Sequence, residues 1–166
     1  MIFREATIHD IENYMIVRMA VKENILSNPA LVTFEDNVDY LTKYGKGWVC
    51  EIDDRIVGFS IVGLVQQNIW ALFVLPEYEG KGIGKKLHDM MLNWYFKQTS
   101  AKVWLGTTPN TKAEVRYFTA FLQPFLTIKP NKIILLFDQS YSLNPNRYFL
   151  IKTTASKPIF RKCPFC

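Results

Sequence analysis

Apolar residues in the first 45 positions recur at the spacing of amphipathic helices, after one short strand-like run at Met1–Ala6. A Thr-x-x-Asp sequence, which is typical of a helix start, begins at Thr7 and again at Thr33. Asn28-Pro29 separates the two patterns. We therefore expect a strand and then two helices, the second ending at Gly45. The positions that keep the helical spacing are Ile11, Tyr14, Met15 and Arg18 in the first and Val38, Leu41 and Tyr44 in the second.

The middle of the chain favours strands, with one long helix among them. Trp48–Ile52 and Arg55–Val62 flank Asp53-Asp54, which predicts a β-hairpin. A loop follows from Gly63 to Asn68, and Ile69–Leu75 is the next apolar run. The pattern then predicts a helix with Ile83, Leu87, Met91 and Trp94 on one face, a strand at Val103–Thr107, and a helix that begins at Pro109-Asn110-Thr111 and reaches Tyr117.

Three glycines at alternate positions follow the strand expected at Ile69–Leu75, in the sequence Gly80-Lys81-Gly82-Ile83-Gly84. A strand that enters a glycine-rich turn and then a helix makes an anion site. The first N–H groups of a helix have no partner inside it, and the helix dipole favours negative charge there. Glycine also brings main-chain N–H groups close to a phosphate. The turn therefore predicts capture of a phosphate or pyrophosphate.

The spacing excludes two common phosphate loops. A P-loop has a longer gap between its glycines and a Ser or Thr after its lysine, whereas Lys86 follows Lys85 here. The dinucleotide fingerprint Gly-x-Gly-x-x-Gly places its third glycine one residue later than Gly84. On spacing alone, a plain tight turn remains the alternative.

The glycine segment resembles the acetyl-CoA loop of the GNAT superfamily of N-acetyltransferases. The consensus of that loop is Gln/Arg-x-x-Gly-x-Gly/Ala after a strand ending in Val-x-Pro. Val74-Leu75-Pro76 and Gly82-Ile83-Gly84 match it, whereas Glu79 stands where the family has Gln or Arg. Two further matches lie in the family's order within residues 1–117: Arg4-x-Ala6-x-x-x-Asp10, and Asn110-x-x-Ala113-x-x-x-Tyr117 with Arg116 in place of the usual Phe.

This resemblance implies an α+β fold, in which a mixed and mostly antiparallel central sheet has flanking helices and a splayed pair of parallel strands. The pair would be Ile69–Leu75 and Val103–Thr107. The wedge between them would hold the pantetheine arm of acetyl-CoA as co-substrate, with the pyrophosphate on the glycine turn and no metal. The cofactor-binding residues implied are Leu72, Phe73, Val74, Glu79, Gly80, Lys81, Gly82, Ile83, Gly84, Lys85 and Asn110.

The resemblance also implies direct attack of an amine on the thioester, and Tyr117 is the catalytic residue it suggests. A tyrosine, with a reference pKa of about 10 against about 8.5 for a thiol, can share a proton with the departing thiolate. Packing on a helix is the alternative role for this side chain. No Ser/His/Asp or Cys/His nucleophile motif is present, and an N–H on the Leu72–Val74 stretch would polarise the thioester carbonyl.

No residue stands out as the general base. His88 is expected to be an exposed helical residue, and His9 lies at a helix start. Trp48 and Trp70 could line an amine pocket, although core packing is the default for both. Cys50 is expected to be buried and inert. Each nearby acid is expected to be a solvated surface group, namely Glu23, Glu35, Asp36 and Glu51.

Length and composition limit the classes of protein to which this chain can belong. The length suits one domain with a sizeable core, no apolar run approaches the about 18 residues of a membrane span, and no signal peptide is apparent. Three cysteines do not form a disulfide framework, and Cys163-x-x-Cys166 lacks a second pair for zinc. We expect a cytoplasmic protein, with a homodimer left open as its assembly.

The C-terminal part changes in character. Residues 1–128 hold 13 basic and 14 acidic side chains, whereas residues 129–166 hold 7 basic and 1 acidic. We expect an N-acetyltransferase core at 1–128 and an atypical segment at 129–166, in which Lys132–Phe137 and Tyr148–Lys152 would be closing strands before a basic tail. The family's glycine after Tyr117 is absent, and Pro124 ends any helix. Ordinary divergence and a shifted reading frame near Val115–Tyr117 both explain the change, and translating the other frames would distinguish them.

Three functions follow from these features. An acetyl-CoA-dependent N-acetyltransferase acting on a small molecule or a protein amine comes first. A non-catalytic or degenerate acyl-CoA-binding domain comes second, because Glu79 and the altered tail would weaken the chemistry. Nucleic-acid binding by the basic, aromatic tail comes last and is not expected, because no nucleic-acid motif accompanies it.

Overall fold

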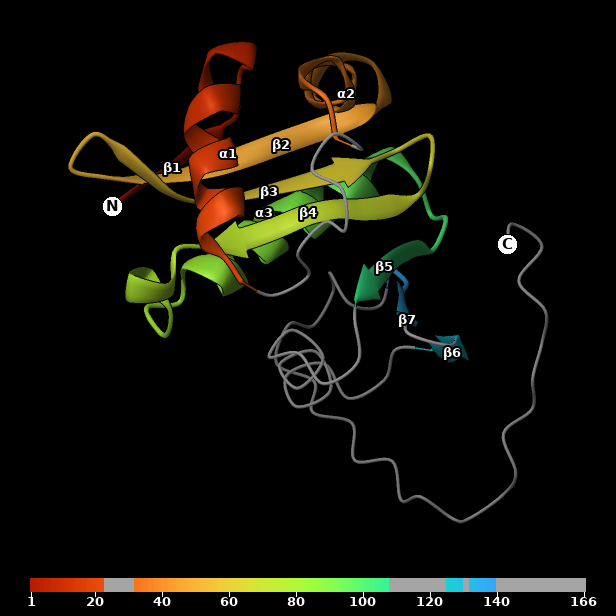
Figure 1. Cartoon of the computed structure of the whole chain (residues 1–166). Coiled ribbons are helices and arrows are strands. Elements are labelled where there is room, and N and C mark those ends of the chain that lie inside the picture. Colours follow the sequence, from red (N-terminus) through yellow and green to blue (C-terminus); the bar gives the residue numbers. More distant parts are fainter. Residues whose placement is uncertain (23–31, 108–124, 130–131, 140–166) are drawn as a thin grey trace.

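A mixed β-sheet covered by helices forms the part of the protein that the computed structural model describes, residues 1–22, 32–107, 125–129 and 132–139 (Figure 1). Within these residues the sheet has seven strands, in the order β1-β2-β3-β4-β5-β7-β6. The elements are β1 (Ile2–Glu5), α1 (Ile11–Ala20), α2 (Phe34–Asp39), β2 (Gly45–Ile52), β3 (Arg55–Gly63), β4 (Asn68–Val74), α3 (Ile83–Gln98), β5 (Val103–Thr107), β6 (Phe125–Lys129) and β7 (Lys132–Phe137).

The strand directions match the fold class expected from the sequence. β1 to β4 pair antiparallel in succession, β4 and β5 pair parallel, and β7 pairs antiparallel with both β5 and β6. The hairpin between β2 and β3 turns at Asp53 and Asp54, which both have positive φ, as a two-residue hairpin turn requires. The strand predicted at Lys132–Phe137 is confirmed as β7, whereas β6 had no counterpart in the prediction. Tyr148–Lys152 lies outside the described residues, and the boundary at residue 128 stays a prediction.

Helices α1 and α3 cover opposite faces of the sheet (Figure 1). On the face under α1, Phe59 of β3 stacks on Tyr14, with ring centroids 4.5 Å apart. On the other face, the Ser60 hydroxyl donates to the carbonyl oxygen of Leu87 in α3 at 3.3 Å. Because successive side chains of a strand point to opposite faces, one strand supplies both halves of the core.

Both predicted capping patterns are present. The main-chain N–H of Thr33 donates to Asp36 Oδ2 at 2.8 Å, and the N–H of Asp36 donates back to Thr33 Oγ1 at 3.1 Å. At the first pattern, the N–H of Thr7 donates to Asp10 Oδ2 at 2.7 Å, and a 3-10 turn at Ile8–Asp10 leads into α1. After α2, a π-helical turn at Tyr40–Tyr44 leads directly into β2, so Gly45 does end the helical segment as expected.

One ion-pair cluster joins the first strand to the first helix. The Arg4 guanidinium donates to both oxygens of Asp10, at 2.8 and 2.7 Å, and also to both oxygens of Glu51 on β2. These hydrogen bonds lower the pKa of Asp10 to about 2, against the cost of removing its carboxylate from water. Glu51 was expected to be a solvated surface acid, and this expectation is wrong because β1 and β2 are neighbours and place it against Arg4.

We expect Asp10→Asn to lower the free energy of unfolding by about 2 kcal/mol at neutral pH. A folded-state pKa below the ordinary 3.8 contributes stability that is present above that value and is lost as the pH falls toward 2. The gap between wild type and variant should therefore shrink between pH 5 and pH 2 in urea unfolding curves. Asp54→Asn in the exposed hairpin is the control and should change little. An equal gap at pH 7 and pH 2.5 would contradict the assignment.

Candidate functional site

The glycine segment forms a tight turn between β4 and α3. A 3-10 turn at Pro76–Tyr78 comes first, and then Gly80 and Gly82 both adopt left-handed backbone, with φ of 77° and 79°. A Cβ atom added at either glycine would meet no atom of the described residues within 4 Å, so the need for glycine is conformational. Left-handed residues in such a turn make a concave array of N–H groups, which is a common anion cradle.

The N–H groups that this turn can offer to a ligand are defined by its internal hydrogen bonds. The first intrahelical bond of α3 runs from the N–H of Lys86 to the oxygen of Gly82 at 3.0 Å, so the N–H groups of Ile83, Gly84 and Lys85 precede it. The N–H of Glu79 donates to Pro76 O at 3.2 Å and is already used. The donors therefore belong to the positive end of a 16-residue helix.

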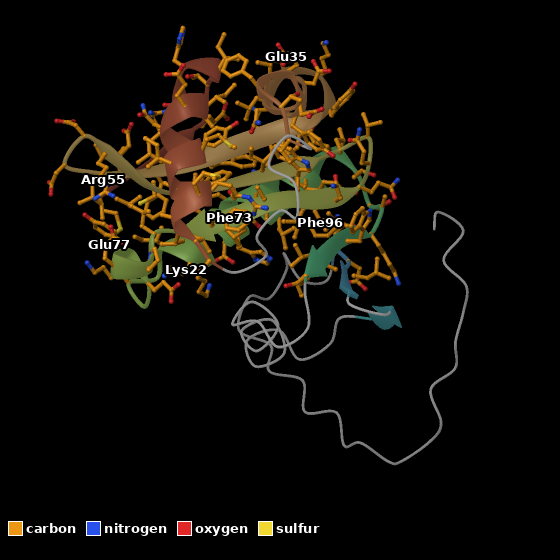
Figure 2. The ribbon with its side chains drawn as sticks, in the orientation of Figure 1. Lys22, Glu35, Arg55, Phe73, Glu77 and Phe96 are labelled. Carbon is orange, nitrogen blue, oxygen red and sulfur yellow. The ribbon has the colours of Figure 1, made fainter. Side chains whose placement is uncertain are left out.

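Charged side chains surround the turn. The Lys81 ammonium lies 4.6 Å from the centroid of the Tyr78 ring, and Lys85 pairs with Asp89 at 2.7 Å. Arg55 pairs with Glu77 at 3.4 Å, and Figure 2 shows the two side chains beside each other at this end of the sheet. The half-buried Glu79 adds a negative charge at the base of the turn.

The strand that leads into this turn has an open edge. The N–H of Leu75 donates to Val57 O at 2.8 Å, so these two residues form a hydrogen-bonded pair between β4 and β3. Phe73 and Phe59, two residues away on each strand, form the next hydrogen-bonded pair. Main-chain groups alternate along an antiparallel strand, and those of Leu72 and Val74 therefore point away from β3. On that side, and among the described residues, β5 pairs with β4 only at Asn68 and Trp104, and the two strands then diverge (Figure 1).

A β-bulge lies at the narrow end of this wedge. Ala71 pairs with Ile61 and Ile69 pairs with Val62, so Trp70 is the extra residue of β4. A bulge bends its strand and increases the local twist, which accounts for the separation of β4 from β5. Trp70 is half-buried and stacks on Tyr40, with ring centroids 4.3 Å apart.

A cation lies on the α1 face of the same strand. The Arg18 guanidinium carbon is 4.0 Å from the centroid of the Phe73 ring. Phe73 also contacts Phe59, on the face of the sheet under α1. The next residue, Val74, faces α3 instead, because a Cβ atom at Gly84 of α3 would lie 3.6 Å from Val74 Cγ2. Removal from water lowers the pKa of Arg18. Arg18 and the glycine turn therefore lie on opposite faces of β4.

Comparison with known proteins agrees with this geometry. The sequence model of the acetyltransferase (GNAT) family matches residues 13–122, which is well over half of the chain. The chain belongs to the GNAT acetyltransferase family. No curated protein matches the sequence significantly.

Solved structures show the GNAT fold in several organisms. The PaiA N-acetyltransferase of Thermoplasma acidophilum, in complex with coenzyme A, has a TM-score of 0.67 at 15% identity over 82% of this chain and 98% of that one. The ribosomal-protein-alanine N-acetyltransferase of Brucella melitensis has a TM-score of 0.63 at 14% identity, over 83% and 99%. YncA of Salmonella typhimurium, with its cofactor acetyl-CoA, has a TM-score of 0.64 at 14% identity, over 82% and 92%.

The structure brings most of the residues that the GNAT resemblance implied to one continuous edge. Leu72, Phe73 and Val74 lead into the turn that holds Glu79 to Lys85. Asn110 and Tyr117 lie outside the described residues, so their roles stay predictions. In the described part of the chain, no group of three or more His, Cys, Asp or Glu side chains could hold a metal, and no helix has the length and apolar character of a membrane span.

His88 was expected to be exposed, and this expectation is wrong. Its side chain is 1% exposed and packs edge-on against Phe137 of β7, with ring centroids 5.6 Å apart. Burial, with a smaller effect of Lys85, lowers the pKa of His88 to about 3, so its ring is neutral at ordinary pH. The sequence pattern could not show this, because the strand that covers His88 is about 50 residues away along the chain.

Other expectations for candidate side chains hold. Cys50 is fully buried and burial raises the pKa of its thiol, and Trp48 packs in the core against Trp94. Glu35, which Figure 2 labels on α2, is exposed. Asp36 of the same helix is also exposed, and Glu23 lies outside the described residues. Arg18 is the residue whose placement sequence reasoning missed. The available signal was a charged residue within an otherwise apolar helical stripe.

Proposed function

We propose that this chain transfers an acetyl group from acetyl-CoA to a primary amine of a small molecule or a protein. The observation that carries the proposal is the open edge at Leu72 and Val74, which runs directly into the left-handed glycine turn at the start of α3. An extended amide-containing arm next to a pyrophosphate is the ligand shape that such an arrangement fits. Two of the three solved structures named above contain coenzyme A or acetyl-CoA.

The pantetheine arm would pair with β4 as an added strand would. Main-chain groups of Leu72 and Val74 would hydrogen-bond its amides, and one of these N–H groups would polarise the thioester carbonyl. The pyrophosphate would accept hydrogen bonds from the N–H groups of Gly82 to Lys85, with Asn110 in a supporting role. Gly80 and Lys81 would shape the turn and add positive charge.

The reaction needs no covalent intermediate on the protein. The amine nitrogen attacks the thioester carbon, the C–N bond forms, the C–S bond breaks, the amine loses a proton and the thiolate accepts one. Since a thioester is already activated, holding the two substrates side by side accounts for much of the rate. We further propose the reducing cytoplasm as the location, in keeping with the buried, free Cys50.

Thiol release measured with acetyl-CoA and a panel of amines tests this function. Thiol release that depends on an amine, together with an acetylated product in mass spectra, is the expected result. If CoA binds, as isothermal titration calorimetry would show, but no amine increases thiol release, the chain is a non-catalytic acyl-CoA-binding domain. If CoA does not bind, both proposals fail.

Tyr117→Phe is expected to lower kcat about tenfold without weakening CoA binding. A thiolate is a good leaving group that gains only part of the usual benefit of a general acid, so the effect should lie below the about 100-fold that such acids often give. Steady-state kinetics and calorimetry measure the two quantities. Unchanged turnover would remove Tyr117 from the mechanism.

Glu79→Gln is expected to tighten CoA binding about fivefold at low salt, because a carboxylate at the base of the turn repels the phosphates. The gain should shrink as ionic strength rises. Glu77→Gln is the matched control, because it removes the same charge two residues further from α3 and should have a smaller effect. Equal effects of the two variants on CoA binding would show that Glu79 does not weaken binding through its place at the base of the turn.

A further inference from the structure

We infer that Trp104 positions β5 so that the wedge beside β4 has the width that the arm of acetyl-CoA needs. This inference rests on the proposed acetyl transfer and assigns a positioning residue to it. Trp104 would touch neither the thioester nor the pyrophosphate, and it acts through the direction in which β5 leaves the narrow end of the wedge.

Two hydrogen bonds from Trp104 fasten β5 to the turn between β3 and β4. Its main-chain N–H donates to Gln67 O at 2.8 Å, and its indole N–H donates to Gln66 O at 3.1 Å. Trp104 pairs in the sheet with the next residue, Asn68, and no other pair joins β4 to β5 in the described part of the chain. One main-chain bond alone lets a strand swing about that point. A second bond from the side chain of the same residue restricts this movement, because hydrogen bonds are directional.

The turn that accepts these bonds is itself held in place. The N–H groups of Leu64 and Val65 both donate to Tyr44 O, at 2.6 and 3.3 Å. Asn68, where the turn enters β4, is 7% exposed, and its side-chain nitrogen donates to the Tyr40 hydroxyl at 3.4 Å. The turn is thus tied to the π-helical segment after α2, and Trp104 transmits its position to β5.

The last two strands follow the direction of β5. This strand pairs with β7 along its whole length, Val103–Thr107, and β7 pairs in turn with β6. Phe137 of β7 also packs edge-on against His88 of α3, with ring centroids 5.6 Å apart, which sets how close these strands lie to the helix. The hydrophobic effect behind such packing is non-directional, so the angle between β4 and β5 depends chiefly on the hydrogen bonds of Trp104.

A small change of this angle has a large effect where the arm would lie. Leu72 is four residues from Asn68 along β4, which is roughly 13 Å at the rise of a strand. Turning β5 by about 10° would therefore move the far wall of the wedge by roughly 2 Å at that level. A wedge that is narrower by this amount excludes the arm, and a wider one leaves the arm packed on one side only. The glycine turn joins β4 to α3 and would stay in place.

Trp104→Phe tests this role, because it keeps an aromatic ring and removes the indole N–H. We expect it to weaken CoA binding about fivefold, as the loss of one neutral hydrogen bond can, and to leave binding of 3′-phospho-ADP within about twofold. The second ligand is CoA without its pantetheine arm, so it would use the glycine turn alone. Calorimetric titration measures both affinities. Trp94→Phe makes the same change on α3, where the ring packs on Trp48 of β2, and should alter neither.

The dependence on salt separates the arm from the pyrophosphate. The arm is uncharged, so the loss of affinity in Trp104→Phe should be the same at low and high ionic strength, whereas a weakened phosphate contact would lose less at high salt. An equal loss for the two ligands would show that Trp104 stabilises the fold without positioning the wedge. Unchanged CoA affinity would show that β5 does not need this bond. The proposed acetyl transfer survives both results, whereas a wild-type protein that binds no CoA would reject both proposals.

Discussion

Gly82→Val is expected to weaken CoA binding about 100-fold, which corresponds to roughly 2.7 kcal/mol. Gly82 has φ of 79° and is the residue before the first turn of α3. A β-branched residue avoids left-handed backbone, at a cost of about 1–2 kcal/mol for the conformation alone. The backbone would relax to negative φ, and the N–H groups that follow would turn away from the phosphate position.

The measurement is calorimetric titration with CoA, at a temperature where wild type and variant are both folded. Gly84→Ala is the matched control, because Gly84 has ordinary backbone and a Cβ there would lie 3.6 Å from Val74 Cγ2, an ordinary contact. This variant should bind CoA within about threefold of wild type. Unchanged affinity in Gly82→Val would mean that the turn does not hold the pyrophosphate.

Gly58→Val is expected to lower the free energy of unfolding by about 3 kcal/mol. Helix α3 packs on β3 at this glycine. A Cβ there would lie 3.1 Å from Ile83 Cγ2, 3.2 Å from Leu87 Cδ1 and 3.2 Å from Phe73 O. One of these contacts is to the backbone of β4, so the strand cannot yield by a change of rotamer. The helix must move outward instead.

The same substitution should weaken CoA binding, because Ile83 is the first residue of α3 and moves with the glycine turn. Urea unfolding measures the stability, and calorimetry at low urea measures the binding. Gly58→Ala adds only the Cβ and should give an intermediate loss of about 1 kcal/mol. A Gly58→Val protein as stable as wild type would show that α3 is not held against β3 at this point.

The sequence alone was sufficient for the features whose causes are local. Thr7 and Thr33 each begin a capping pattern because the partner carboxylate is three residues away, and the structure has both. Asp53-Asp54 predicted a hairpin because only these two residues separate the two strand-like runs, and β2 and β3 do pair across them. The alternate glycines predicted a tight turn for the same reason, since backbone conformation depends on the residue that adopts it; anion binding by that turn stays a prediction.

The features that required the tertiary structure depend on which strands become neighbours. His88 of α3 is buried because Phe137 of β7 packs against it. Glu51 forms its ion pair with Arg4 because β1 pairs with β2. The open edge at Leu72 and Val74 depends on a bulge at Trp70, and no local pattern marks the register in which that bulge occurs. Arg18 looked like one more member of a helical stripe.

This chain therefore contains, in its sequence, the order of its strands and helices up to β5 and the tight glycine turn before α3. Those properties follow from backbone preferences and hydrophobic spacing over a few residues. Only the folded sheet decides which main-chain groups stay open beside that turn and which face of β4 carries a cation. Both are set by pairing and packing between segments far apart in the chain, whose contacts contribute nothing until the segments meet.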